Sequence, residues 1–367
     1  MHIDPSRRSD LLRGRRIPDE ALRRLPKTDL HCHLDGSLRL ETFLELAAGA
    51  GLPVPADREE ARRLFLPEAR VGGQPEFLRY FDHTLAVLQD APSLARAARE
   101  LALDFAAEGG WYLEVRFCPL LHLARGLSAD DAVAAVVAGL REAEARAAVQ
   151  TGVIITGLRT INPEVSYSLA ELAVRWKGRG VVAFDLAGAE KDYPAKDHRE
   201  AFYLVMNNNL NSTIHAGEGF GPASIHQALH YCGANRIGHG TRLHEDPDLL
   251  SYVNDHRIPL EMCISSNVQM GVVPSVADHP LRRYLDLGLR VTLNTDNRLF
   301  VPTDLVRELR LAADAFDLTL LEVENLLLNG FKSAFVPARR RAALVEQALH
   351  RFGELRDEMR LDELEVA

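Results

Sequence analysis

Two histidines separated by one residue, His31 and His33, are the first side chains in this 367-residue sequence whose types and spacing suggest chemistry. Residues i and i+2 of a β-strand point to the same face, so two imidazoles placed there can bind one metal ion. A buried strand can also hold two histidines as hydrogen-bonded core residues. The pair alone therefore leaves both interpretations open.

Further polar residues follow short apolar runs elsewhere in the chain. They are His215 in Ile-His-Ala-Gly-Glu, His239 in Ile-Gly-His-Gly and Asp296 in Asn-Thr-Asp. The carboxyl ends of the strands of an α/β barrel meet at one mouth. His31, His33, His215 and Asp296 would then surround one divalent ion and leave a position for water, as in catalytic zinc sites. We expect one Zn²⁺ per chain, although other first-row ions bind similar ligands.

Two residues near these ligands suit proton transfer. A bound divalent ion can lower the pKa of water from 15.7 to about 7, which makes hydroxide available at neutral pH. Glu218 lies three residues beyond His215, and His239 ends the next apolar run. A carboxyl group there can donate a proton and an imidazole can accept one from water. Alternatively, Glu218 only meets the dipole of a following helix.

Eight short runs rich in apolar or β-branched residues would position these side chains. Such runs, when longer helical patterns separate them, are typical of buried parallel strands. From the third onward they recur at roughly the spacing of one strand plus one helix. The sequence therefore predicts an α/β protein, a (β/α)8 TIM barrel. The predicted strands are 28–34, 112–118, 153–158, 181–186, 212–216, 236–240, 260–264 and 290–295.

Helical periodicity fills the stretch between the first two strands and predicts a helical cap over one end of the barrel. Pro222 suits a first helical position, and Thr303 could cap a helix that begins near Asp304. The tail after Pro337 is amphipathic and predicts C-terminal helices. We expect residues 1–25 to be a solvated leader and residues 26–367 to form a single TIM-barrel domain.

The overall composition limits the classes of molecule that this chain is expected to bind. A formal net charge of -9 disfavours nucleic acid, because nucleic-acid binders usually carry a basic face. Four cysteines without C-x-x-C spacing, and no apolar signal segment, indicate a reduced, cytoplasmic setting. No apolar run is long enough to span a membrane. We therefore expect a small-molecule partner, and no pattern in the sequence indicates an oligomeric state.

Taken together, several short motifs resemble those of the adenosine deaminase family. The resemblance runs from about residue 25 to about residue 335 and implies an amidohydrolase-type barrel. The motifs are Thr28-Asp-Leu-His-Cys-His-Leu-Asp-Gly-Ser37, Asp185-Leu-Ala-Gly-Ala-Glu190, His215-Ala-Gly-Glu218, Arg236-Ile-Gly-His-Gly240, Ser265-Ser-Asn267 and Asn294-Thr-Asp296.

The resemblance implies a role for each residue in hydrolytic deamination. Glu218 would protonate ring N1 of a purine, and His239 would orient the water and accept its proton. Water would add at C6 and ammonia would leave, so that adenosine, and by extension 2′-deoxyadenosine, gives a 6-oxopurine nucleoside such as inosine. The metal ligands would be His31, His33, His215 and Asp296, as the spacing also indicates.

Three further positions would bind the nucleoside. Gly188 matches a family glycine whose backbone approaches purine N3, and Asp35 matches a carboxylate that binds the ribose 5′-hydroxyl. Related adenine deaminases tend to carry Glu at the position of Asp35. Asn297 departs from the best-known pattern, in which Asp donates to purine N7, but an amide can donate the same hydrogen bond.

Other functions remain open at this point. Asn297 leaves the substrate less certain, so adenine deamination or deamination of another nucleoside such as 6-aminodeoxyfutalosine are alternatives. A different metal-dependent hydrolase could use the same barrel, but a proton donor such as Glu218 suits a basic ring nitrogen more than an ester. A non-catalytic nucleoside-binding protein is disfavoured because every expected ligand and proton-transfer residue is present.

Overall fold

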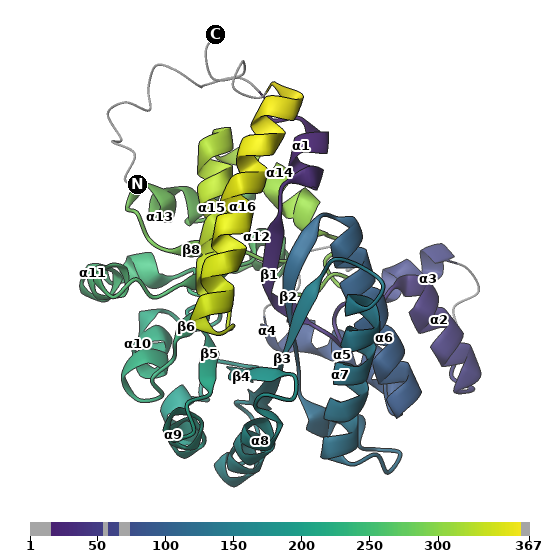
Figure 1. The fold of residues 1–367 in the computed structure, drawn as a ribbon. Helices are drawn as coiled ribbons and strands as arrows, with labels where there is room; N and C mark the ends of the chain where they lie inside the picture. Colours follow the sequence, from purple (N-terminus) through teal and green to yellow (C-terminus); the bar gives the residue numbers. More distant parts are fainter. Residues whose placement is uncertain (1–15, 54–57, 66–73, 361–367) are drawn as a thin grey trace.

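Eight parallel strands form the centre of the molecule, which we describe from a computed structural model over residues 16–53, 58–65 and 74–360 (Figure 1). The strands are hydrogen-bonded in sequential order, and every neighbouring pair is parallel. They are β1 (Lys27–His33), β2 (Gly110–Phe117), β3 (Gln150–Leu158), β4 (Val181–Ala187), β5 (Asn211–Ala216), β6 (Arg236–His239), β7 (Leu260–Met262) and β8 (Val291–Leu293).

Contacts between β1 and the segment after β8 close the barrel. Cys32 forms a parallel bridge with Asp296. The His33 N–H donates to the Asp296 carbonyl at 2.8 Å, and the Asp296 N–H donates to the His31 carbonyl at 2.8 Å. The predicted (β/α)8 barrel is therefore confirmed, and the closure itself places the first and last candidate ligands side by side.

Helices surround the strands and extend beyond them. They are α1 (Asp19–Arg24), α2 (Leu40–Gly49), α3 (Arg58–Phe65), α4 (Gln74–Phe77), α5 (Phe81–Val87), α6 (Ala91–Ala107), α7 (Ala129–Glu144), α8 (Pro163–Trp176), α9 (Arg199–Asn207), α10 (Pro222–His230), α11 (Pro247–Asp255), α12 (Ile264–Gln269), α13 (Leu281–Asp286), α14 (Leu305–Ala315), α15 (Leu320–Ser333) and α16 (Ala338–Met359). In the view of Figure 1, α16 lies in front of the strands.

The insertion after β1 covers the carboxyl end of the barrel, as its periodicity predicts. Phe65 of α3 stacks on Phe300, and Phe81 of α5 meets the same ring edge-on at 4.8 Å between centroids. Phe300 lies just after the Asp296 segment. Phe81 also approaches the His33 ring, at 6.2 Å. An aromatic cluster therefore joins the cap to the mouth that holds the histidines.

Two local predictions differ from the structure. The residue that caps α14 is Asp304, not Thr303, because the Asp304 carboxylate accepts the Arg307 N–H at 2.8 Å. The Thr303 hydroxyl instead donates to Glu308 at 2.7 Å. The last two strands end earlier than predicted, since Ile264 already begins α12 and β8 stops at Leu293.

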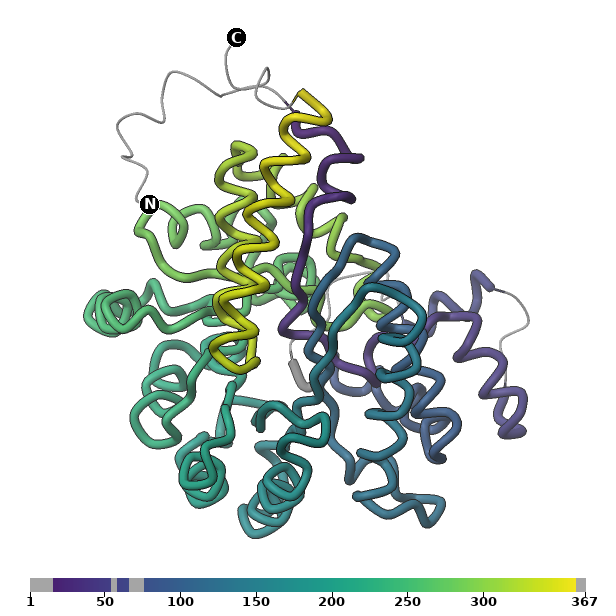
Figure 2. Tube along the Cα trace, in the orientation of Figure 1, coloured from purple at the N-terminus to yellow at the C-terminus, as the bar shows by residue number. Residues whose placement is uncertain are grey.

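Part of the segment expected to be a solvated leader is packed. Ile17, Leu22 and Leu25 are buried, and α1 contacts α14 and α16, so the two ends of the described chain lie together (Figure 2). The prediction of a solvated leader is therefore wrong for these residues, because their apolar side chains pack into the core. Residues 1–15 lie outside the described residues. Among the described helices, none combines the length and hydropathy needed to cross a membrane.

A matched pair of glycine substitutions tests the packing of α6 on α7. A Cβ at Gly139 would lie 2.1 Å from the Ala95 carbonyl oxygen, whereas one at Gly353 of α16 would meet nothing within 4 Å. We expect Gly139→Ala to lower the free energy of unfolding by roughly 1–3 kcal/mol and Gly353→Ala to raise it by roughly 0.5–1 kcal/mol. Urea unfolding followed by circular dichroism measures both, and equal stabilisation would contradict the close helix contact.

Candidate active site

Four side chains converge at the carboxyl end of the barrel. His33 Nε2 lies 3.1 Å from His215 Nε2 and 3.4 Å from Asp296 Oδ1, while His31 Nε2 lies 3.6 Å from the same oxygen. The possible ligand atoms of His31, His33 and His215 all lie within 4.8 Å of one another, and so do those of His31, His239 and Asp296. The structure therefore brings the predicted ligands together, with His239 beside them.

The other ring nitrogen of two histidines is held by a buried carboxylate. His31 Nδ1 lies 2.8 Å from Glu261 Oε2, and His215 Nδ1 lies 3.1 Å from Asp185 Oδ1. A carboxylate that accepts from Nδ1–H fixes the tautomer in which Nε2 carries the free lone pair. Both imidazoles therefore present an unprotonated nitrogen to the centre of the cluster.

The protonation states of the clustered histidines also favour binding of a metal cation. Burial, and then neighbouring charges, hold the pKa of His31, His33 and His239 well below the ordinary value. Neutral imidazole is the form that binds metals. His31 Nε2 is fully buried and has no hydrogen-bond partner, which is costly unless something else contacts it. The donor set, two or three imidazoles with a carboxylate, is one that zinc prefers.

Asp296 and His239 adopt a backbone conformation that side chains rarely take. Both have a φ of 62°, in the left-handed region that costs energy for residues other than glycine. Asp296 is held by the Ser266 hydroxyl, which donates to Oδ2 at 2.6 Å, and by the Asn297 amide, which donates to Oδ1 at 2.7 Å. Such strain concentrates at functional sites, where the surroundings fix it.

Glu218 and His239 lie side by side next to the cluster. Glu218 Oε1 is 3.3 Å from His239 Nδ1, and Asn267 Nδ2 donates to the same oxygen at 2.9 Å. The loop that carries Glu218 is fixed by Glu190, whose carboxylate accepts the N–H groups of Gly217, Glu218 and Gly219 at 2.8–2.9 Å. A carboxyl group and a neutral imidazole are thus placed for proton transfer at the metal-type cluster.

The three residues expected to bind the substrate lie at the ends of strands around the same mouth. Asp35 follows β1, is buried, and has an Oδ1 without a partner; burial raises its pKa to about 7. Gly188 follows β4 with a φ of 95°, which disfavours any side chain there. Asn297 directly follows Asp296, and its Oδ1 is buried without a partner. Unpartnered buried oxygens at Asp35 and Asn297 are available to a ligand.

Buried charged residues lie beneath the histidines and were not predicted from the sequence. Glu261 of β7 accepts from Arg116 at 2.8 Å, from Arg236 at 2.6 Å and from the Thr213 hydroxyl at 2.9 Å. Asp185 and Glu190 belong to one of the motifs that resemble the family, but the motif did not predict their buried hydrogen bonds. The sequence does contain one sign of these charges, which is a charged residue within an apolar strand, as in Leu260-Glu261-Met262. A buried charge must be paired, so such a residue indicates a buried partner of opposite charge.

The fold and the site together define an amidohydrolase-type barrel, with a His/Asp centre at the carboxyl ends of its strands. A family model described as Adenosine deaminase matches residues 26–350. The chain belongs to the adenosine deaminase family. The resemblance inferred from the motifs is therefore confirmed.

Individual relatives agree with this placement. The chain is 41% identical to an adenosine deaminase of Mycobacterium avium over 352 residues, which cover 90% of this chain and 96% of that protein. Its fold is similar to that of the adenine deaminase of Arthrobacter aurescens (TM-score 0.82, 26% identity, 89% of this chain and 98% of the other). It is also similar to the N6-mAMP deaminase of Arabidopsis (TM-score 0.81, 27% identity, 91% and 99%).

Metal analysis of a single variant tests the cluster. We expect His215→Ala to lose most of its bound zinc, because one of the converging imidazoles is removed. His350→Ala is the control, since this exposed histidine lies on α16 away from the cluster. Elemental analysis after dialysis against a weak chelator gives the zinc content per chain. Equal zinc in the two variants would contradict the site.

Proposed function

We propose that this protein catalyses the hydrolytic deamination of adenosine, and of 2′-deoxyadenosine, to the corresponding inosine and ammonia. The observation that carries the proposal is the position of Glu218 and His239, which lie 3.3 Å apart beside the converging His31, His33, His215 and Asp296. Membership of the adenosine deaminase family, and 41% identity to a protein of that name, support the same reaction.

One zinc ion per chain would be held by His31, His33, His215 and Asp296. When bound, a divalent ion supplies a water molecule with a pKa lowered to about 7. Glu261 and Asp185 orient the imidazoles of His31 and His215, and Ser266 orients the Asp296 carboxylate. These partners keep the ligand atoms in place, so that little rearrangement accompanies binding.

Proton transfers are assigned to the two remaining groups. His239 accepts a proton from the attacking water, because burial lowers its pKa and so leaves the imidazole neutral with a free lone pair. Glu218 donates a proton to purine N1 and makes C6 more electrophilic. The water oxygen bonds to C6, and His239 passes the proton it accepted to the amino nitrogen, so that the bond from C6 breaks and ammonia leaves. The proton of the added hydroxyl then returns to Glu218 through the adjacent His239 as the 6-oxopurine forms. Asn267 donates a hydrogen bond to Glu218 and so keeps the Glu218 carboxyl group facing His239.

Nucleoside binding is assigned to Asp35, Gly188 and Asn297. The unpartnered Asp35 oxygen accepts from the ribose 5′-hydroxyl, and the backbone at Gly188 approaches purine N3. The Asn297 amide nitrogen uses one hydrogen on Asp296 and has a second to offer purine N7. The aromatic cluster of Phe65, Phe81 and Phe300 covers this mouth and excludes water from the bound base.

We further propose that residues 26–367, together with the packed segment 16–25, form one catalytic domain that acts in the cytoplasm on a small molecule and not on nucleic acid. Two observations support this setting. All four cysteines are buried and free, as is usual in reducing compartments. The formal net charge of -9 disfavours a surface that follows phosphates.

A panel of substrates tests the assigned specificity. Adenosine and deoxyadenosine should be converted, as followed by the absorbance change to the 6-oxopurine, because Asp35 provides a hydroxyl acceptor. Adenine, 6-aminodeoxyfutalosine and N6-methyl-AMP are the competing substrates, two of them suggested by the names of the structural relatives. No turnover of either adenine nucleoside at micromolar enzyme would contradict the proposal, and a clear preference for another compound would reassign the substrate.

Substitution of Glu218 separates chemistry from metal binding. We expect Glu218→Gln to keep its zinc while kcat falls by roughly 10²–10⁴-fold, because the amide cannot donate a proton to N1 as a carboxyl group does. Glu171→Gln, at an exposed position on α8, should behave as the parent protein. Initial rates and zinc analysis on the same samples provide the test. Full activity in Glu218→Gln would remove the proton-donor role.

A further inference from the structure

A second cavity lies at the opposite, amino end of the barrel. It has a volume of about 760 Å³, within the usual range for small-molecule sites. Residues at or just before the starts of four successive strands line it, and the ends of α15 and α16 complete it. These lining residues include Asn211, Asn235, Pro259, Arg290, Lys332 and Ala338. We refer to it as the amino-end cavity.

The amino-end cavity is lined by cations without acids. Arg257, Arg290, Lys332 and Arg341 line it, and none of the lining residues is Asp or Glu. None of the four forms an ion pair with a carboxylate in the part of the chain that the structure describes. Arg236 also lines the cavity, but Glu114 and Glu261 neutralise it. The cluster is notable in a chain whose formal net charge is -9.

The four cations repel one another. Burial lowers the pKa of Arg290, and the neighbouring Arg257 and Arg341 lower it further. The pKa of Lys332 is lowered by burial and then by Arg290 and Arg257. The Arg290 Nε is buried without a hydrogen-bond partner. Like charges without a carboxylate partner cost stability, and the cost is greatest at Arg290, which is partly buried. A bound anion would relieve this repulsion.

The start of α16 adds a second unfavourable arrangement at the same place. This helix has no side-chain cap and no acidic residue in its first turn, although acids are favoured there by the helix dipole. Its sequence instead begins Ala338-Arg-Arg-Arg341. Ala338 and Arg341 line the amino-end cavity. Free N–H groups at a helix start favour bound anions, so helix and cation cluster point to the same type of ligand.

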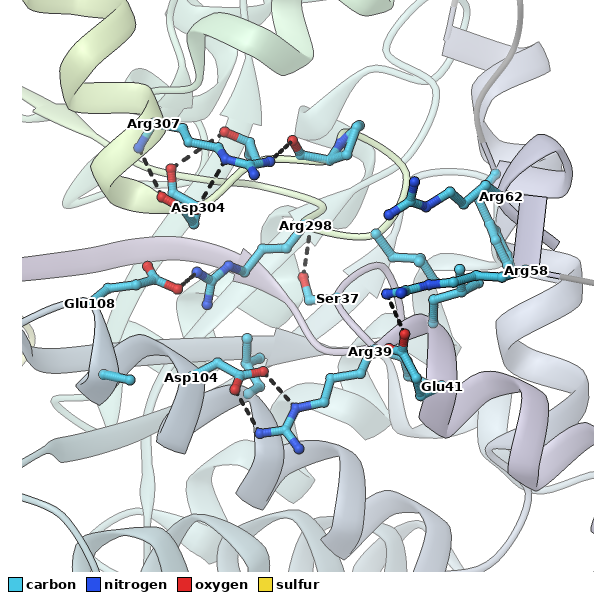
Figure 3. Close-up of a pocket in the computed structure, with 18 of the residues that line it drawn as sticks. Ser37, Arg39, Glu41, Arg58, Arg62, Asp104, Glu108, Arg298, Asp304 and Arg307 are labelled. Carbon is cyan, nitrogen blue, oxygen red and sulfur yellow. Dashed lines mark hydrogen bonds and ion pairs between the residues drawn. The ribbon is translucent and has the colours of Figure 1, made fainter.

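A cavity on another side of the molecule shows the contrast (Figure 3). It has a similar volume, about 730 Å³, and also contains several arginines. There, Arg39 binds Asp104 at 2.6 Å, Arg298 pairs with Glu108, and Arg58 pairs with Glu41. Arginines in that cavity are thus largely neutralised by the protein itself. In the amino-end cavity the neutralising groups are missing among the described residues.

We propose that the amino-end cavity binds a small ligand through two or more phosphate groups. Four cations in one cavity call for a ligand with several negative charges, and guanidinium groups bind phosphate oxygens in pairs. The site lies at the end of the barrel opposite His31 and Asp296 and is independent of the proposed deaminase function. A nucleoside polyphosphate and an inorganic pyrophosphate share the recognised groups, so the test includes both.

Calorimetric titration of the full chain tests this site. Pyrophosphate and ATP should each bind at low salt, and binding should weaken as salt is raised, because the contacts are ionic. The double variant Lys332→Gln/Arg341→Gln should bind both ligands roughly tenfold or more weakly, since it loses two charged hydrogen-bond donors. The control Arg339→Gln removes a charge from the same helix turn at an exposed position outside the cavity lining and should bind as the parent does.

The results of these titrations distinguish binding in the amino-end cavity from binding elsewhere on the protein. Similar affinities for pyrophosphate and ATP would assign recognition to the phosphates, and tighter ATP binding would add a contribution from the nucleoside. Binding that the double variant does not weaken would place the ligand elsewhere, for example at the histidines, and would overturn the proposal, as would no binding of either compound at low salt. If the double variant unfolds, Lys332→Gln alone, at an exposed side chain, repeats the comparison.

Discussion

The hydrogen bond between the Glu261 carboxylate and Nδ1 of His31 is the interaction on which the rest of the site depends. Both side chains are completely buried, and an unpaired carboxylate in such a place would be very costly. Glu261 is stabilised by Arg116 and Arg236 from two other strands. The barrel interior is therefore organised around paired charges, and this pairing turns the free nitrogen of His31 toward the mouth.

The same pairing links the two ends of the barrel. Arg236 donates to Glu261 through Nε and to the Ser333 carbonyl through Nη1 at 2.8 Å, and Ser333 lines the amino-end cavity. The carboxyl end thus gathers imidazoles and carboxylates, whereas the amino end gathers cations. One continuous set of buried polar contacts lies between them, which makes the barrel core a scaffold for both.

Much of the fold could be predicted from the sequence, because strand runs and helix periodicity are local signals. All eight strands were located, and the convergence of the candidate ligand residues at their ends followed from the geometry of a barrel. The interior network could not be derived in the same way, since the partners of Glu261 come from strands distant in sequence. Local pattern also could not decide between Thr303 and Asp304 as a cap, because both can accept a backbone N–H and only tertiary contact with Glu308 engages Thr303.

The N-terminal segment, which was expected to be a solvated leader, shows a related limit of prediction from local sequence. Residues around Ile17 and Leu22 are flanked by arginines and acids, which indicates solvent exposure when the sequence is taken alone. Packing against α14 and α16, formed some 300 residues later in the chain, buries them instead. The proposed nucleoside contacts are similarly non-local, because Asp35, Gly188 and Asn297 follow three different strands, which only the folded barrel brings to one mouth.

The most direct test of the candidate metal site is a crystal structure of the zinc-loaded protein with anomalous data collected at the zinc absorption edge. We expect one strong peak per chain, within about 2.0–2.2 Å of a nitrogen or oxygen atom of each of His31, His33, His215 and Asp296. A peak held by other residues, or the absence of a peak between these four side chains in fully active protein, would contradict it.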